Sequence, residues 1–340
     1  MSALAVTGIG LVTPVGLSAR SSAAALRAGI MRFSELPFHD RGGVPIVGAR
    51  VREVADGLLG VRRYAALLGA ALADAERRLS EPFPRPVPLV LGLPAQDRPG
   101  RPARLEAEIA PLLETYGGWE FDPATSAVVS SGNTSGARAL EVAQQILRSS
   151  AAGVVVVACA DSLVNAAALD HLEASGRLKT ATDPDGVIPS EAAGALVVAR
   201  AGDRGSLLEV AGIGFAKETA DRSRGRPNVG EGLARAIRSC LADAGSDTRV
   251  THFRLSDVAG DRGAFSEAQY ALGRTLTEPH AAYPLWLTAE SFGEIGAASV
   301  PAQIAVAAAA FAKDYAPGPG ALCQSGSESG ERAALLVRAG

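Results

Sequence analysis

The chain has 340 residues, of which 47% are hydrophobic and 20% are charged, and its formal net charge is −3. This composition predicts a folded, soluble protein with a large core. The sequence contains no basic cluster that would favour nucleic-acid binding, and no apolar run is long enough to cross a bilayer. No secretory signal pattern opens the sequence, so we expect a cytoplasmic protein that does not bind nucleic acid or membranes.

Apolar runs that are typical of strands alternate with helical patterns in the first half of the chain. Several of these runs are continuous in Val and Leu, which predicts strands covered on both faces and a mainly parallel sheet. A stretch rich in Pro, Gly and charge at residues 95–102 predicts a surface loop. Strands are predicted at residues 4–6, 87–91, 127–129, 153–158 and 195–199, and helices at 61–79 and 139–147.

The second half repeats the alternation. Its most helical stretch, residues 297–313, is apolar on nearly every face, which predicts a central, buried helix. Polar stretches at 217–228 and 315–320 predict surface loops. Further strands are predicted at 206–213, 252–255 and 333–338, and a further helix at 231–244.

A short internal repeat divides the chain. The sequence Val-Thr-Gly-Ile-Gly at residues 6–10 returns as Val-Ala-Gly-Ile-Gly at 210–214, and each copy is followed by a loop and an Ala- and Leu-rich helix. Self-similarity of this kind predicts two related α/β units. We place their boundary in the turn at 201–206, which gives domains at 1–203 and 204–340.

Residues 126–136 combine an apolar strand, a turn of small residues and the start of a helix. A strand, a sharp turn and a helix N-terminus form a common platform for a nucleophile, because the turn exposes the side chain and the helix dipole favours negative charge. The central residue, Asn133, cannot act as a nucleophile, since its amide has no basic lone pair.

The turn at 131–136 resembles the active-site turn of the β-ketoacyl synthases of the thiolase-like superfamily, with Asn133 where that family has cysteine. Segments 5–16, 154–161 and 183–194 resemble three further family motifs, in the expected order. The resemblance implies an α/β fold, a five-layer α-β-α-β-α sandwich built from two similar halves. It implies no cofactor and no metal.

The same resemblance locates two catalytic histidines of the family. The first corresponds to a position near Ser256 or Asp257, and the second corresponds to Gly293, with Glu294 beside it. The family's phenylalanine gate corresponds to residues 327–330, which lack phenylalanine. We therefore predict no catalytic residues and three vestigial positions: Asn133, a position near Ser256, and Gly293. The histidines of the chain are His39, His171, His252 and His280.

Several polar residues have a structural interpretation instead. We expect Thr134 or Ser135 to cap the helix after the turn, and Asn133 to adopt an unusual backbone angle. Asp161 and Glu191 are expected to fix turns by hydrogen bonding. Asp257 and Glu294 are expected to lie near Asn133. The three cysteines, Cys159, Cys240 and Cys323, are expected to be small core residues, with Cys323 the most open to reaction.

Two functional hypotheses follow. In the first, the protein is a catalytically degenerate synthase-like protein that acts through protein contacts, as a scaffold, an adaptor or a chain-length-factor-like subunit. It would form a homodimer, or a heterodimer with a ketosynthase-like chain, through the apolar strand at 125–129, and an acyl carrier protein is a further candidate partner. The short chain and the lost gate favour the adaptor. In the second, it is an acyltransferase or hydrolase of acyl-carrier or acyl-CoA thioesters that uses other residues, such as Ser131.

Overall fold

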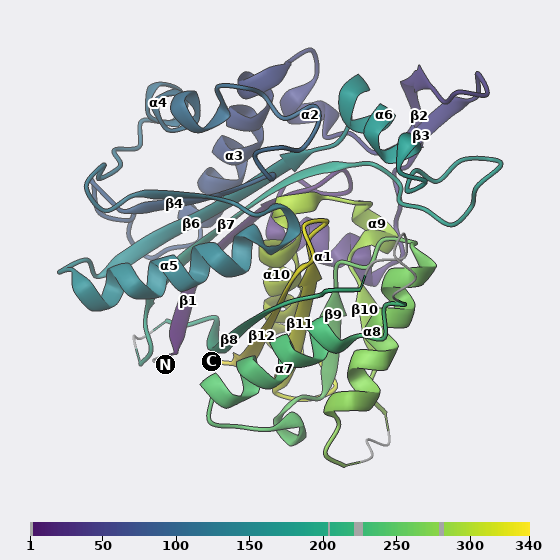
Figure 1. Cartoon of the computed structure of the whole chain (residues 1–340). Coiled ribbons are helices and arrows are strands. Elements are labelled where there is room, and N and C mark those ends of the chain that lie inside the picture. Colours follow the sequence, from purple (N-terminus) through teal and green to yellow (C-terminus); the bar gives the residue numbers. More distant parts are fainter. Residues whose placement is uncertain (1–2, 203–204, 221–226, 279–281) are drawn as a thin grey trace.

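The structure is a computed structural model that describes residues 3–202, 205–220, 227–278 and 282–340. It is a mixed α/β fold in which helical layers alternate with sheet layers (Figure 1). Within the described residues, every helix is too short or too polar to span a bilayer. The predicted domain boundary between residues 203 and 204 lies outside the described residues, so the exact division stays a prediction.

The strands of the two halves have the same topology. In each half the strand order runs through two parallel pairings and then two antiparallel pairings. The first half has the order β5 (Ala127–Ser130), β4 (Leu89–Leu93), β6 (Val154–Ser162), β7 (Glu191–Arg200), β1 (Leu4–Val12). The second has the order β10 (Leu285–Leu287), β9 (Phe253–Ser256), β11 (Gly320–Gly326), β12 (Glu331–Ala339), β8 (Leu208–Lys217).

A short antiparallel contact joins the halves. Leu4, Ala5 and Val6 of β1 pair with Val210, Glu209 and Leu208 of β8, so the strands form one continuous ten-stranded sheet. Because the two halves of this sheet diverge from the contact, helices fit between them, as Figure 1 shows for α5 and α10.

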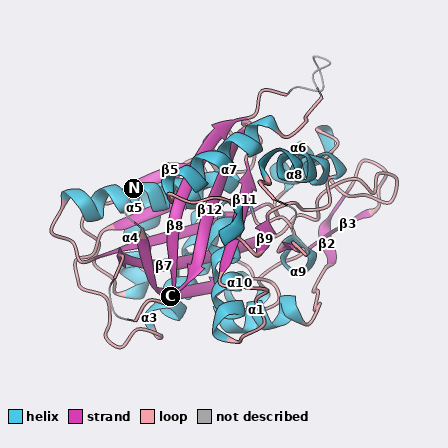
Figure 2. Cartoon of the chain, turned by 90° about the horizontal axis from the view of Figure 1, so that it is seen from below, coloured by secondary structure: helices cyan, strands magenta, loops and turns pink. Residues whose placement is uncertain are grey.

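The helices complete five layers. Helices α3 (Gly60–Glu76) and α4 (Leu105–Gly117) cover the first half of the sheet, and α7 (Glu231–Asp243) and α8 (Arg262–Thr275) cover the second (Figure 2). The central layer contains α1 (Ala19–Arg27), α5 (Ser135–Ser149) and α10 (Ser299–Ala312). Smaller elements are β2 (Ser34–His39), β3 (Pro45–Gly48), α2 (Arg52–Ala55), α6 (Ala166–Ala174) and α9 (Ala289–Phe292).

Close packing of one helix on each half explains the internal repeat. A Cβ atom on Gly10 would lie 1.9 Å from the carbonyl oxygen of Ala71 in α3, and one on Gly214 would lie 2.2 Å from that of Ala236 in α7. Real Cβ atoms do not approach backbone this closely. Both copies of the repeat therefore provide a glycine at the point where a helix lies directly on the strand backbone.

The positions of the predicted elements agree with the structure, but the predicted direction of the strands does not. Each predicted strand and helix overlaps an observed element, and α10 is buried around almost its whole circumference, as predicted. The sheet is not mainly parallel, however, because β1, β7, β8 and β12 run antiparallel to their neighbours. These strands are covered on both faces by helices, so they show the continuous apolar runs that usually indicate parallel strands.

The packing predicts a large effect of a single methyl group. Gly10→Ala is expected to lower the free energy of unfolding by about 3 kcal/mol or more, because α3 must move away from β1. Gly273→Ala is the matched control: it lies inside α8 with nothing within 4 Å of its added Cβ, and it should gain roughly 0.5–1 kcal/mol. Urea unfolding of both variants measures this, and equal stability of the two would contradict the packing argument.

Candidate functional site

The predicted turn lies between β5 and α5. Ser131 follows the strand, and residues Gly132–Thr134 form one 3-10 turn that leads into α5. Gly132 adopts a left-handed conformation with φ of 64°, and Asn133 does not have a positive φ. The prediction of an unusual backbone angle at Asn133 is therefore wrong. The preceding glycine takes that angle because it has no Cβ atom to clash.

The hydroxyl groups of Thr134 and Ser135 hold the turn rather than cap the helix. The Ser135 hydroxyl accepts the Ser131 N–H at 2.8 Å and donates to the Leu93 carbonyl of β4 at 2.7 Å. The Thr134 hydroxyl is 2.7 Å from a carboxylate oxygen of Glu331 in β12. Neither side chain accepts a hydrogen bond from the first turn of α5, so the cap prediction is wrong. These bonds fix the turn to both halves of the sheet.

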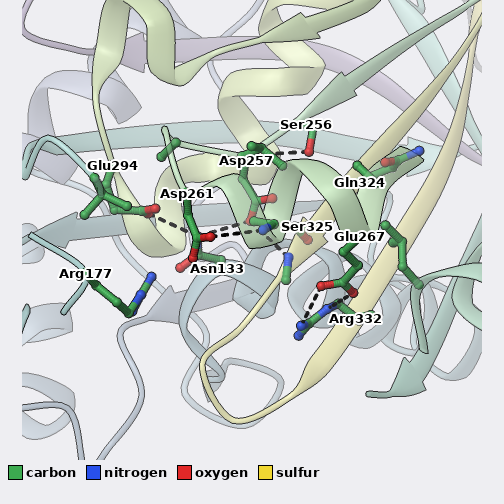
Figure 3. Close-up of a pocket in the computed structure, with 17 residues that line it drawn as sticks. Asn133, Arg177, Ser256, Asp257, Asp261, Glu267, Glu294, Gln324, Ser325 and Arg332 are labelled. Carbon is green, nitrogen blue, oxygen red and sulfur yellow. Dashed lines mark hydrogen bonds and ion pairs between the residues drawn. The ribbon is translucent and has the colours of Figure 1, made fainter. Parts of the chain in front are cut away.

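The Asn133 side chain lies between two carboxyl groups (Figure 3). Its Nδ2 atom donates to Asp257 Oδ2 at 3.1 Å and to Glu294 Oε1 at 3.1 Å. Asp257 directly follows β9, and Glu294 lies between α9 and α10. Backbone N–H groups complete the arrangement, since Gly326 donates to Asp257 at 3.0 Å and Gly296 to Glu294 at 2.8 Å. The prediction that both acids lie near Asn133 is confirmed.

Both carboxyl groups resist ionisation. Burial, followed by the nearby charge of Glu294, raises the pKa of Asp257 to about 7. Burial also raises the pKa of Glu294, and this effect is opposed by the positive charge of Arg177. At neutral pH the Asp257–Glu294 pair is therefore protonated in part of the molecules. The Asn133 amide then donates to a carboxylate in some molecules and to a neutral carboxyl group in others.

The two other predicted positions lie beside this contact rather than in it. Ser256 is the buried last residue of β9, and its hydroxyl accepts the Val258 N–H at 3.3 Å. A Cβ atom on Gly293 would lie 2.8 Å from that of Ser190, so this position faces the segment that leads into β7. The side chains that face Asn133 belong to the next residue in each case. The assignment of Ser256 and Gly293 as former histidine positions stays a prediction.

Cavities lie on two sides of Asn133. One has a volume of about 90 Å³ and is lined by Asp257, Gln324 and Arg332 among others. The other has a volume of about 260 Å³ and is lined by Arg98, Asp161 and Glu328 among others. Asn133 and Glu294 line both, so the hydrogen bond between them forms part of the partition.

An ion pair and a histidine contact hold the segment that was predicted to correspond to the family's gate. Glu328 lies in the turn between β11 and β12, 3.1 Å from Nε2 of His171 and in contact with the Arg177 guanidinium. His171 belongs to α6 of the first half. The turn therefore spans the two halves at the 260 Å³ cavity, and charged groups hold it there.

The remaining histidines do not reach the turn. His171 is the one histidine that lines a cavity beside Asn133 among the described residues. His252 precedes β9, where its backbone N–H donates to Gly320 at 2.8 Å, and His39 ends β2. His280 lies outside the described residues. Over the described ranges, no histidine forms a hydrogen bond with the Asn133 side chain, and no group of three or more acids, histidines or cysteines is arranged for a metal ion.

Asp161 and Glu191 fix neighbouring segments, as predicted. Asp161 accepts the Ala297 N–H at 3.1 Å and lies 2.8 Å from the Arg98 guanidinium. Glu191 is fully buried against Arg63 and accepts the Val51 N–H at 2.8 Å. Sequence reasoning missed Arg98, Arg177 and Glu331. For Arg98 the reason is that a single arginine in a polar loop gives no signal of burial.

The cysteines are core residues. All three are buried, and burial raises the pKa of the Cys323 thiol to about 12. Cys323 lies inside β11, where it pairs with Leu255 and Leu335. The expectation that Cys323 is a core residue is confirmed, and the strand continues past it as far as Gly326.

No protein-family model and no curated protein sequence matches the chain. Solved structures do match its fold. A structure described as the ishigamide ketosynthase/chain length factor matches with a TM-score of 0.73 and 20% identity, over 99% of each chain. A type II polyketide synthase acyl carrier protein in complex with its ketosynthase bound to the hexaketide matches with a TM-score of 0.80 and 17% identity, over 100% of each chain.

A β-ketoacyl synthase from Burkholderia phymatum STM815 matches with a TM-score of 0.74 and 18% identity, again over 100% of each chain. At these identities the likeness defines the fold. The chain has the thiolase-like fold of ketosynthases and chain length factors, as the sequence resemblance implied.

The raised pKa values predict a pH dependence of stability. Below about pH 3 both the folded and the unfolded Asp257 are mainly protonated, because the ordinary pKa of the carboxyl group is 3.8. As the pH rises from 4 to above 7, the unfolded carboxyl ionises first, so the folded state loses stability. Asp257→Asn should remove part of this loss and stabilise the protein by roughly 2–4 kcal/mol at pH 8 but not at pH 4.

Urea unfolding at pH 4, 6 and 8 measures the effect. Asp170→Asn is the control, since Asp170 is an exposed carboxylate on α6. An Asp257→Asn variant whose stability runs parallel to that of the wild type at all three pH values would contradict the buried-acid description.

Proposed function

We propose that the chain is a catalytically degenerate β-ketoacyl synthase-like protein that acts through contacts with other proteins. The supporting observation is the environment of position 133, where the related fold carries its nucleophile. A neutral amide stands there, and its nitrogen donates to the carboxyl groups of Asp257 and Glu294. Condensation requires a thiolate and donors for a developing oxyanion, each donor contributing roughly 10²–10³-fold in rate. Two carboxyl groups oppose negative charge at this point instead.

The partner surface in this proposal is the free edge of β5. β5 ends the strand order, and among the described strands it pairs with β4 alone. Its Val128 side chain is 42% exposed. An apolar edge strand of this kind favours pairing with another chain. The similar structures include ketosynthase and chain length factor complexes, which supports a ketosynthase-like partner for this chain in a homodimer or heterodimer.

The proposal has further parts. Residues 1–203 and 204–340 are its N-terminal and C-terminal thiolase-like domains, and the protein works in the cytoplasm. An acyl carrier protein is a further candidate partner, as in one of the similar structures. The cavity beyond Asn133 has a volume of only about 90 Å³, which favours an adaptor over a subunit that holds a long acyl chain by itself.

A charge on the free edge tests the partner surface. Val128→Lys is expected to convert an associated form to a monomer, or to lose the protein partner captured from the native host, because a buried lysine opposes edge pairing. Val44→Lys is the matched control, since Val44 is 45% exposed but lies beside the separate β2–β3 hairpin. Light scattering and mass spectrometry of the captured complex measure the outcome. An unchanged complex for Val128→Lys would contradict the proposed surface.

Restoring the thiol tests the loss of chemistry. Asn133→Cys is expected to show no condensation or decarboxylation of a malonyl thioester, because Asp257 and Glu294 would disfavour the thiolate. Its alkylation by iodoacetamide should be slower than that of free cysteine, and adding Asp257→Asn should speed it. An acyl-enzyme adduct of Asn133→Cys in intact mass spectrometry, followed by a condensed product, would contradict the proposal.

A second candidate is an acyltransferase that acts on acyl-carrier or acyl-CoA thioesters with other residues. The observation that favours it is the raised pKa of Asp257 beside a cavity, since such a carboxyl group can exchange protons near neutral pH. It requires thioester turnover that is abolished by Asn133→Ala or Ser131→Ala. Purified wild-type protein with no turnover and no acyl adduct excludes this candidate.

A further inference from the structure

A separate cavity lies between α1, β10 and α10. Its volume is about 310 Å³, at the lower end of the roughly 300–1,000 Å³ of small-molecule sites. None of the residues that line it also lines the two cavities beside Asn133. Its walls are mainly apolar and include Leu26, Leu285 and Val306. A second cavity of about 450 Å³ shares Leu26, Leu287 and Glu290 with it, so the two adjoin near the C-terminal end of α1.

Two stacked aromatic rings form one wall. The Trp286 and Tyr315 ring centroids are 6.0 Å apart, and the buried Phe253 ring packs against Trp286 at 4.5 Å. The guanidinium carbon of Arg27 lies 4.2 Å from the centroid of the Tyr315 ring. The positive charge of Arg27 therefore lies at the end of the apolar wall, over the Tyr315 ring.

Polar groups in this cavity are mainly donors. Within the described residues, no hydrogen bond or ion pair engages the Arg27 guanidinium, the Trp286 ring N–H or the Tyr315 hydroxyl, and all three side chains line the cavity. The one carboxylate of the lining belongs to Glu290, at the boundary with the second cavity. A guanidinium beside an apolar surface matches a ligand that has a carboxylate and a hydrocarbon body.

We propose that this cavity binds a small apolar carboxylate, with its carboxylate at Arg27 and its hydrocarbon body along Trp286 toward Leu26 and Leu287. The charge on Glu290 disfavours a second carboxylate at the far end, so the site takes a monocarboxylate. This inference is independent of the proposed function, because it uses no residue of the Asn133 site.

Octanoate is the probe, and the chain provides its own reporter. Trp119 and Trp286 are its only tryptophans, and Trp119 is buried in the outer layer against Glu76. Octanoate is expected to give a saturable change of tryptophan fluorescence in the wild type and in Trp119→Phe. Calorimetric titration of the wild type gives the same affinity without any substitution. No saturable binding up to millimolar octanoate by either method overturns the proposal.

Two exposed charges provide tests of opposite sign. Arg27→Gln should weaken octanoate binding about three- to tenfold, and Arg27→Lys should restore most of it. Glu290→Gln should strengthen binding about twofold, because it removes a like charge from the cavity. Octan-1-ol, which has the chain without the charge, should bind more weakly than octanoate and should not respond to Arg27→Gln. Equal affinities of Arg27→Gln and the wild type for octanoate overturn the proposed orientation.

Discussion

The side-chain amide of Asn133 links the two halves of the molecule at the candidate site. It is carried by the first half, at the start of α5, and both its acceptors belong to the second half. An amide suits this place because it is neutral, provides two hydrogens and is short enough to leave the carboxyl groups buried. Without these donors, the carboxyl groups of Asp257 and Glu294 would each lose a hydrogen-bond partner in a largely enclosed site, where unpaired charge is costly.

The fold makes this contact possible because it brings the two equivalent halves of the sheet together around Asn133. Glycines at equivalent places in β1 and β8 let α3 and α7 lie directly on the strands. Helices α5 and α10 fill the remaining space between the two halves of the sheet. The turn that carries Asn133 leads into α5. All five layers of the fold are thus present, and the side chains at its centre are the Asn133 amide and the carboxyl groups of Asp257 and Glu294. Under the proposed function, a fold with these residues at its centre acts through contacts rather than condensation.

Much of the fold could be predicted from the sequence because its signals are local. Strand and helix patterns located the main elements, and the repeated Val-x-Gly-Ile-Gly predicted two halves. Strand direction could not be predicted in the same way, because burial on both faces gives antiparallel β7 and β12 the same apolar composition as parallel strands.

Sequence reasoning expected Asp257 and Glu294 near Asn133, and both side chains face it. Resemblance placed the two histidine positions near Ser256 or Asp257 and at Gly293, and that assignment stays a prediction. At Gly293 the backbone has a positive φ and no room for a side chain. Arg98 could not be found from the sequence at all, because its partner Asp161 is distant along the chain and the pair is formed only by the fold.

The amide contact can be observed directly. The chain has three asparagines, Asn133, Asn165 and Asn228, so selective ¹⁵N-asparagine labelling gives three side-chain NH₂ signals, and Asn133→Gln identifies the one from this site. The account predicts that both Asn133 protons are protected from exchange and shift downfield as the pH rises through about 7, when Asp257 ionises. A freely exchanging NH₂ signal that does not change between pH 5 and 8 would contradict it.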